Sequence, residues 1–314
     1  MNSSFTKRTR RDLQHFFAAV LIAALTVCIA ACAGATRPPD AAGPRANEPP
    51  YPVLLVANED RTTASLAAWS ALTKAQNIPD APAPEFDPVT GAIRSLPVLP
   101  NGAALYLPKI GAQPPMTEEE TRESLRRFIV NESRLIGAEP QQLSLVARTE
   151  TPANIKTARY EQRPFRYALR GGFGMLQIDF APDGRLLQLS STCIPEAESL
   201  QRSGTGVRPR YTAEEVIKRL VGRSFALTGN TTEAKTSANV NTNQNTAVAP
   251  EVTILAGDQI SIRELVVYPR RRLADPAVIE FHLAWEIALA HGTQNYTVYL
   301  DAVTDEFLGA TPGV

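Results

Sequence analysis

The sequence has 314 residues, with 32 Lys and Arg against 32 Asp and Glu, and only three cysteines. Residues 1–31 carry four of the basic and one of the acidic side chains, so the remaining 283 residues have 28 basic against 31 acidic side chains and a net charge of −3. A chain without a basic excess lacks the field that attracts phosphate backbones, and we therefore expect no nucleic-acid binding. Three cysteines are too few for a disulfide scaffold or a cysteine-rich zinc module.

The first 32 residues have the layout of an export signal. A basic cluster precedes the apolar run 16–31, which is shorter than the roughly 20 residues of a membrane span. Small residues directly before Cys32 resemble a bacterial lipobox, which implies that 1–31 are a cleaved signal peptide and that Cys32 carries a lipid. The resemblance implies an exported protein, lipid-anchored in the bacterial cell envelope at the outer membrane and facing the periplasm. The alternatives are an uncleaved anchor helix or an ordinary signal peptide, and residues 9–13 match a twin-arginine signal in part.

Proline marks the stretch that follows the signal. Fifteen of the 25 prolines fall within the first 115 residues. Residues 32–50 are rich in proline and alanine and predict an extended tether, because proline fixes φ and lacks an amide donor. Residues 51–112 predict an N-terminal arm, with a short helix over 63–76 and a turn at 86–91.

A capping box marks the start of a first α+β unit over residues 113–198. Thr117 lies three residues before Glu120 and predicts a helix that runs to Gly137. Four mostly alternating runs follow and predict strands at 143–149, 159–169, 175–180 and 186–190. An Asp-Gly pair between the last two runs indicates a hairpin.

The same order of a helix followed by strands begins again within residues 199–314. Residues 199–210 predict a linker, and a second capping box at Thr212 predicts a helix that reaches Phe225. The Asn, Thr and Ala repeats of 229–249 predict a mobile, low-complexity loop, because they have almost nothing to bury. Strands are predicted at 252–255, 262–268, 278–290, 296–300 and 306–308.

The longest of these strands alternates apolar and polar residues. Apolar residues from Ile279 to Leu289 alternate with Glu280, His282 and Glu286, which predicts one buried and one solvated face. The three polar side chains could ligate a metal ion, but two or three mixed ligands on an exposed strand form no closed shell. We therefore favour a solvated polar face and predict neither a metal nor a cofactor.

Short segments of the first unit occur in a characteristic order: Leu125-Arg126-Arg127-Phe128, Leu135-Ile136-Gly137, Leu143-Ser144-Leu145, Arg159-Tyr160-Glu161-Gln162, Gly171-Gly172 and Asp183-Gly184-Arg185. This set resembles the propeptide domain of fungalysin and thermolysin-type peptidases. A second set consists of Thr212-Ala213-Glu214-Glu215, Glu264-Leu265-Val266-Val267-Tyr268-Pro269, Leu283-Ala284-Trp285 and the run from Tyr296 to Thr304. It resembles the PepSY domain that follows in those propeptides, and residues 86–96 are similar to their lead-in.

The resemblance implies an α+β fold with two cystatin-like domains, each a helix packed on an antiparallel sheet, over 113–198 and 199–314. In the family these domains assist folding of a metallopeptidase and cover its active site. Asp305 stands where the family has a glycine, and we expect the turn to survive because Asp tolerates positive φ better than most residues. The printed sequence ends at Val314, where the family's peptidase domain would begin.

Thermolysin-type catalysis needs His-Glu-x-x-His on a helix, because two imidazoles one turn apart bind zinc while the glutamate activates water. After residue 32 the sequence has only His282 and His291, and neither belongs to such a motif. No Gly-x-Ser-x-Gly elbow of a serine hydrolase is present either. Cys193 is expected to pack as a small apolar residue, with a reactive or intermolecular role as the alternative. The run 270–272 is a basic cluster that we expect to be solvated, with contact to an anionic partner as the alternative.

We therefore predict a non-catalytic lipoprotein that binds a partner protein. The predicted partner is an exported thermolysin-like metallopeptidase, which the chain would inhibit or help to fold. The alternative is a structural or adaptor protein of the envelope without a peptidase client. The predicted partner-binding surface consists of Arg159, Tyr160, Gln162, Asp183, Arg185, Glu280, His282 and Glu286.

Overall fold

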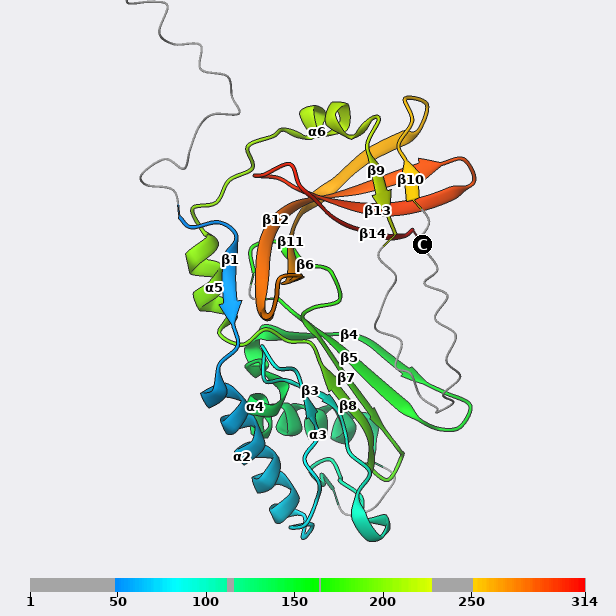
Figure 1. Cartoon of the computed structure of the whole chain (residues 1–314). Helices are drawn as coiled ribbons and strands as arrows, with labels where there is room; N and C mark the ends of the chain where they lie inside the picture. Colours follow the sequence, from blue (N-terminus) through cyan, green and yellow to red (C-terminus); the bar gives the residue numbers. More distant parts are fainter. Residues whose placement is uncertain (1–48, 112–115, 164, 228–250, 314) are drawn as a thin grey trace, which may run out of the picture. The chain divides into compact units, whose positions relative to one another are not determined.

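The computed structural model describes residues 49–111, 116–163, 165–227 and 251–313 (Figure 1). The signal peptide, Cys32, nearly all of the tether and the loop 229–249 therefore lie outside the described residues. None of the described helices is long and apolar enough to cross a membrane. The elements belong to the α+β class, as predicted, with antiparallel sheets and few helices (Figure 1).

The first sheet has four antiparallel strands in the order β4-β5-β7-β8. They are β4 (Leu143–Glu150), β5 (Lys156–Gln162), β7 (Met175–Phe180) and β8 (Leu186–Ser191). Helix α3 (Glu118–Asn131) begins at the predicted capping box of Thr117 and Glu120, and α4 (Ser133–Ile136) ends at Gly137, whose φ is +77°. Leu125 and Phe128 of α3 share one buried cluster with the inward side chains of β7, so the helix packs on this sheet.

The N-terminal arm contributes to the same core. Helix α2 (Glu59–Ala75) begins four residues before the predicted start, because the Asn58 side chain caps the amide of Asp60 at 2.8 Å. Trp69 is 2% exposed and its indole donates to the Pro82 carbonyl, whereas Leu66 of the same helix is exposed. The short strands β2 (Glu85–Phe86) and β3 (Ile93–Ser95) and the 3-10 turns η2 (Pro100–Gly102) and η3 (Pro140–Gln142) complete this part.

The second sheet has the order β14-β13-β12-β11-β6, with β1 also paired to β12 (Figure 1). Its long strands are β11 (Gln259–Arg272), β12 (Asp275–His291), β13 (Gln294–Asp301) and β14 (Phe307–Pro312). Helix α6 (Ala213–Leu220) begins at the predicted capping box of Thr212, and its Val216 and Leu220 pack on Ile287, Val298 and Leu300 of the sheet. The small pair β9 (Ser224–Ala226) and β10 (Glu251–Thr253) adjoins this core.

Two strands of the second sheet come from earlier parts of the chain. Strand β1 (Val53–Val56) of the arm pairs antiparallel with residues 278–281 of β12. Strand β6 (Ala168–Leu169) pairs in parallel with Val266 and Val267 of β11. The strand predicted over 159–169 is therefore split, because its two ends belong to different sheets.

Two boundaries of the predicted elements also differ. The predicted linker contains a helix, α5 (Ala197–Gly204), whose Ala197 is fully buried. Helix α6 ends at Leu220 rather than Phe225, because Gly222 has a φ of +86° and Phe225 belongs to β9. The turn at Asp305 forms as expected, with a φ of +65°, and its carboxylate accepts from Arg223 at 2.6 Å.

Glu132, at the junction of α3 and α4, is partly buried and gives a pH-dependent prediction. Burial raises the pKa of its carboxyl group to about 7. A carboxyl whose pKa is raised on folding stabilises the protein below its unfolded-state pKa, and this stability is lost as pH rises through the folded value. We expect Glu132→Gln to raise the free energy of unfolding by about 1 kcal/mol at pH 8 and to leave it nearly unchanged at pH 4.5.

Urea denaturation at the two pH values measures this difference. The matched control is Glu150→Gln, on the exposed end of β4, which should change neither value. An equal effect of Glu132→Gln at both pH values would contradict the assignment.

Candidate functional site

Two turns in the structure share the sequence Asp-x-Val-Thr followed by a residue with positive φ. The first runs from Asp87 to Gly91 and the second from Asp301 to Asp305, with φ values of +70° and +65° at their last residues. In each turn one carboxylate oxygen accepts from the amides two and three residues later, at 2.9 Å for both amides in the first and at 2.7 and 2.8 Å in the second. This arrangement leaves the second oxygen of each aspartate available to a distant side chain.

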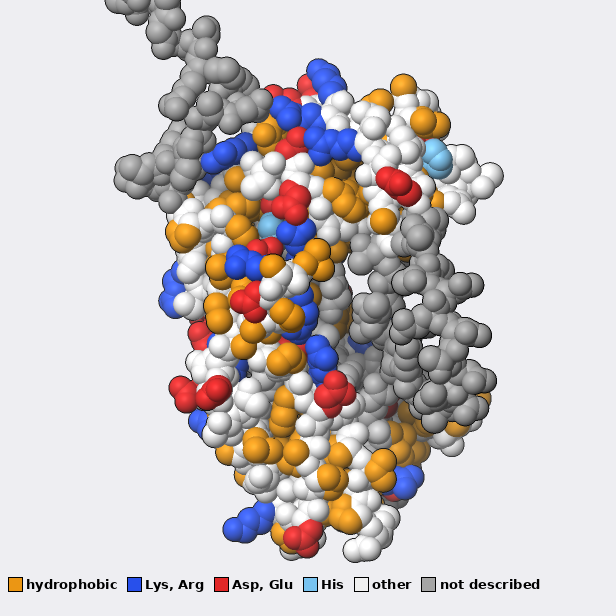
Figure 2. Space-filling model, viewed as in Figure 1, with side chains coloured by type: hydrophobic (Ala, Val, Ile, Leu, Met, Phe, Trp, Pro, Cys, Tyr) orange, Lys and Arg blue, Asp and Glu red, His pale blue; other side chains and the backbone are white. Residues whose placement is uncertain are grey.

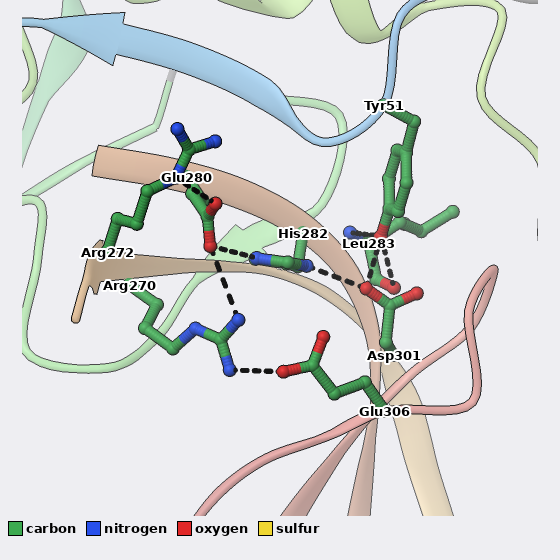
Figure 3. Close-up of polar contacts among 8 residues, drawn as sticks. All are labelled: Tyr51, Arg270, Arg272, Glu280, His282, Leu283, Asp301 and Glu306. Carbon is green, nitrogen blue, oxygen red and sulfur yellow. Dashed lines mark hydrogen bonds and ion pairs between the residues drawn. The ribbon is translucent and has the colours of Figure 1, made fainter. Parts of the chain in front are cut away.

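The second oxygen of Asp301 binds two side chains (Figure 3). The Tyr51 hydroxyl of the arm donates to it at 2.7 Å, and His282 Nδ1 of β12 lies at the same distance. The Tyr51 oxygen in turn accepts from the Leu283 amide at 3.0 Å. Because an ionised carboxylate only accepts, Nδ1 of His282 carries the hydrogen. Tyr51, 250 positions away in sequence, is thereby fixed to the turn that closes β13 and β14.

The network continues from His282 toward the surface. Its Nε2 faces Glu280 at 3.4 Å, and Glu280 accepts from Arg272 at 2.7 Å and from Arg270 at 3.3 Å (Figure 3). Arg270 also pairs with Glu306 at 2.8 Å. The geometry describes a structural clasp that joins Tyr51 of the arm, strand β12 and the Asp301 turn.

The environment keeps the two carboxylates of the clasp ionised. Burial favours the neutral acid at Asp301, but hydrogen bonds from His282, Thr304, Tyr51 and Val303 outweigh it and hold the pKa below its usual value. At Glu280 burial also opposes ionisation, and hydrogen bonds from Arg272, Arg270 and His282 again lower the pKa. Burial and the nearby Asp301 charge raise the pKa of Tyr51, so its hydroxyl stays a donor.

The first turn, which belongs to the arm, binds a side chain that comes from the second sheet. The second oxygen of Asp87 in the arm accepts from Arg94 at 2.9 Å and from Arg271 near the end of the β11–β12 hairpin. Asp87 is 7% exposed, and burial favours its neutral form. Hydrogen bonds from the turn amides, the Thr90 amide first, and the charges of its two arginine partners together outweigh burial and lower the pKa of Asp87. The arm thus gives Tyr51 to the second sheet and receives Arg271 from it. We refer to the Asp301 contacts and the Asp87 contacts as the two halves of the clasp.

The basic cluster 270–272 is accordingly paired rather than simply solvated. Arg270 and Arg272 bind Glu280, and Arg271 binds Asp87. On the face drawn in Figure 2, Lys and Arg side chains lie interspersed with Asp and Glu side chains.

Four of the predicted surface residues are buried, so the prediction that they form an accessible surface is wrong. Glu280, His282 and Glu286 of β12 are 8%, 3% and 5% exposed, and Gln162 of β5 is the fourth buried residue. The face of β12 that carries them is covered by the arginines of β11, the Asp301 turn and a cluster around Tyr268 and Tyr299. The polar residues that alternate along β12 therefore lie in buried polar contacts and do not form the solvated face that the sequence predicted.

Glu286 and Gln162 are held by specific partners. Glu286 accepts from Arg170 Nε at 2.5 Å and pairs with Arg263 at 3.3 Å. Gln162 is 3% exposed and holds the backbone of Ile194 from both sides, with bonds of 2.7 and 2.8 Å.

The other four predicted residues lie in two places on the first sheet. Arg159 of β5 is exposed and donates to Gln177 at 3.2 Å, while the neighbouring Tyr160 is half-buried, which raises its pKa to about 12. Asp183 and Arg185 are exposed in the β7–β8 turn. The structure therefore does not bring the eight predicted residues together into one surface.

Two further sequence-based expectations concern metals and thiols. Within the described ranges there is no group of three or more His, Cys, Asp or Glu side chains that could hold a metal ion. Cys193 is fully buried in the core of the first unit, as predicted, and burial raises the pKa of its thiol to about 12.

Sequence reasoning missed Tyr51, Asp87 and Asp301. The repeated Asp-x-Val-Thr turn was the signal that could have found the two aspartates, since each occurrence buries a carboxylate with one oxygen unused by the turn.

The comparisons with known proteins assign this chain to no family. No family model matches the chain, and no curated protein matches it. Among solved structures, the chain is similar to the C-terminal domain of YpeB from Bacillus megaterium, with 10% identity and a TM-score of 0.26 over 65% of this chain and 69% of that one. A likeness at this level carries no argument about function.

Proposed function

We propose that this chain is a non-catalytic protein that binds a partner protein at the free edge of strand β4. The observation that carries the proposal is the exposure of this edge. Among the described residues, β4 pairs with β5 alone, so the amides and carbonyls along its other side have no strand partner. A register shift between Leu145 and Ala147 leaves Leu145 and Val146 44% and 40% exposed.

An edge of this kind suits an extended segment of a partner. Its eight residues span roughly 26 Å at 3.3 Å per residue, which is enough to pair with a complete added strand. In strand addition the main-chain hydrogen bonds supply affinity and the side chains supply specificity. Leu145 and Val146 would supply the apolar contacts.

We propose an exported thermolysin-like metallopeptidase as the partner, inhibited or assisted in folding by this chain. Support comes from the resemblance of residues 113–198 and 199–314 to the propeptide domains of such peptidases. The alternative, an envelope adaptor without a peptidase client, is an outcome of the test below.

The test compares the full chain with a Val146→Arg variant. A charged side chain at a free edge opposes strand pairing, so we expect at least about tenfold weaker inhibition of such a peptidase, or a correspondingly lower refolding yield. Leu187→Arg on β8 is the matched control, because Leu187 is also 40% exposed and should have no effect. If wild-type protein changes neither proteolysis nor refolding, the peptidase proposal fails. If crosslinking in cells recovers only cell-wall components, the adaptor function replaces it.

We further propose that a lipid on Cys32 anchors the protein in the bacterial envelope, at the outer membrane facing the periplasm. Only the sequence supports this, since Cys32 lies outside the described residues. We expect Cys32→Ser to move the protein from the membrane fraction to the soluble fraction, and Cys193→Ser to leave it in the membrane fraction. Membrane retention of Cys32→Ser would refute the anchor.

A further inference from the structure

A cavity of about 100 Å³ lies beside the clasp. Its walls come from β1, the segment between β5 and β6, helix α5 with the residues after it, and strands β11 and β12. Tyr51 and His282 line it, so the clasp described above forms part of its wall. The polar groups that these two side chains offer are engaged by Asp301, Leu283 and Glu280.

The remaining wall is mainly apolar. The Phe165 and Phe281 rings stack with their centroids 6.2 Å apart and their planes at 23°. Val53, Leu200 and Val267 add aliphatic surface. Because the neighbouring polar groups are already satisfied, the interior favours an apolar group over water.

The lining also contains one exposed cation. Arg166 is exposed, and its guanidinium carbon lies 5.3 Å from the centre of the Tyr167 ring, which also lines the cavity. Among the described residues, no carboxylate forms an ion pair or hydrogen bond with Arg166. A ligand that fits both features is therefore apolar at one end and anionic at the other.

We propose that this cavity binds the apolar C-terminal residue of a peptide, with a branched aliphatic side chain inside and the α-carboxylate on Arg166. The size of the cavity indicates that a single side chain of the ligand lies inside it. An apolar cavity of about 150 Å³ is large enough for benzene, so about 100 Å³ suits a smaller group, such as the four-carbon side chain of leucine. This proposal does not depend on the β4 edge.

The test measures binding of N-acetyl-leucine, N-acetyl-leucinamide and N-acetyl-glycine to the full chain by calorimetry or by NMR titration. N-acetyl-leucine mimics a peptide terminus, the amide removes its charge, and the glycine derivative removes its side chain. We expect the amide to bind about fivefold more weakly than the acid, and the glycine derivative not to bind.

Two variants separate the charge from the cavity. Arg166→Gln should abolish the preference for the acid over the amide, while Arg202→Gln, on α5 but outside the cavity lining, should retain it. Gly204→Leu should abolish binding of both leucine ligands by filling the cavity. Gly204 is helical, and a Cβ there would lie 3.8 Å from Val53 Cγ2, which is an ordinary contact, so the backbone accepts a side chain at this position. A wild-type melting temperature of the variant is the check that it folds.

Equal affinity for acid and amide would overturn the proposal, as would unchanged binding in Gly204→Leu. No saturable binding of N-acetyl-leucine by a wild-type chain with normal circular dichroism would overturn it as well.

Discussion

Replacing Asp301 with alanine is expected to lower the free energy of unfolding by about 4 kcal/mol, because four hydrogen-bond donors lose a buried, charged acceptor. Asp301 is fully buried and accepts from the Tyr51 hydroxyl, His282 Nδ1 and the amides of Val303 and Thr304. Its removal leaves these four donors without their acceptor, and each unsatisfied buried donor costs about 1–3 kcal/mol before relaxation.

Urea denaturation followed by tryptophan fluorescence measures the loss. The matched control is Asp183→Ala, because Asp183 also accepts from an amide in its turn, at 3.0 Å from Arg185 N, but is exposed. We expect the control to lose less than about 1 kcal/mol. Similar losses in both variants would show that the turn alone, and not the clasp, accounts for the effect.

The effect of Asp301→Ala should also depend on pH. Folding lowers the pKa of Asp301, so the carboxylate contributes stability above its unfolded-state pKa and loses it as pH falls through the folded value. The difference between wild type and Asp301→Ala should therefore shrink in acid. In a double-mutant cycle, Tyr51→Phe should cost much less in the Asp301→Ala background than in wild type, because the two groups share one hydrogen bond.

The local rules of sequence predicted the starts of two helices, but they missed α5. The capping boxes at Thr117 and Thr212 fixed the starts of α3 and α6, because a cap depends only on residues three positions apart. The hairpin of β7 and β8 followed from its Asp-Gly turn, and Asp305 adopts positive φ as expected.

The candidate site could not be predicted in the same way, because its contacts join residues far apart in sequence. Alternation along β12 marks which residues share a face, but it does not show what covers that face. Glu280 and His282 are buried only because β11 arginines and the Asp301 turn cover them. The pairing of β1 with β12 joins positions more than 220 residues apart, and four residues of local pattern cannot specify such a partner.

The second large effect is expected for Asp87, at the other half of the clasp. Replacing Asp87 with alanine should lower the free energy of unfolding by about 3 kcal/mol, since it removes the acceptor of two turn amides and the carboxylate partner of Arg271. Arg94 also loses its contact with Asp87 and keeps only its ion pair with Glu85 at 3.5 Å. The loss should be smaller than for Asp301, because the arginine side chains are 42% and 29% exposed and water can solvate them.

Asp87→Asn separates the turn from the ion pairs. The amide oxygen of asparagine can still accept from Val89 and Thr90, so only the ionic part is lost, at about 1 kcal/mol. Asp80→Ala, at an exposed aspartate in the same arm, is the matched control and should lose less than about 0.5 kcal/mol.

The same variants test whether Asp87 holds the β11–β12 hairpin to the arm. Leu273, at the end of this hairpin, is 99% exposed, and Arg271 and Arg272 immediately precede it. Loss of the Arg271 contact should therefore make the hairpin open more often, and trypsin should cleave after Arg271 or Arg272 faster in Asp87→Ala than in Asp80→Ala. If trypsin cleaves both variants at the wild-type rate, the pairing of β11 with β12 holds the hairpin closed without Asp87. Asp87 would then stabilise only the turn from Asp87 to Gly91.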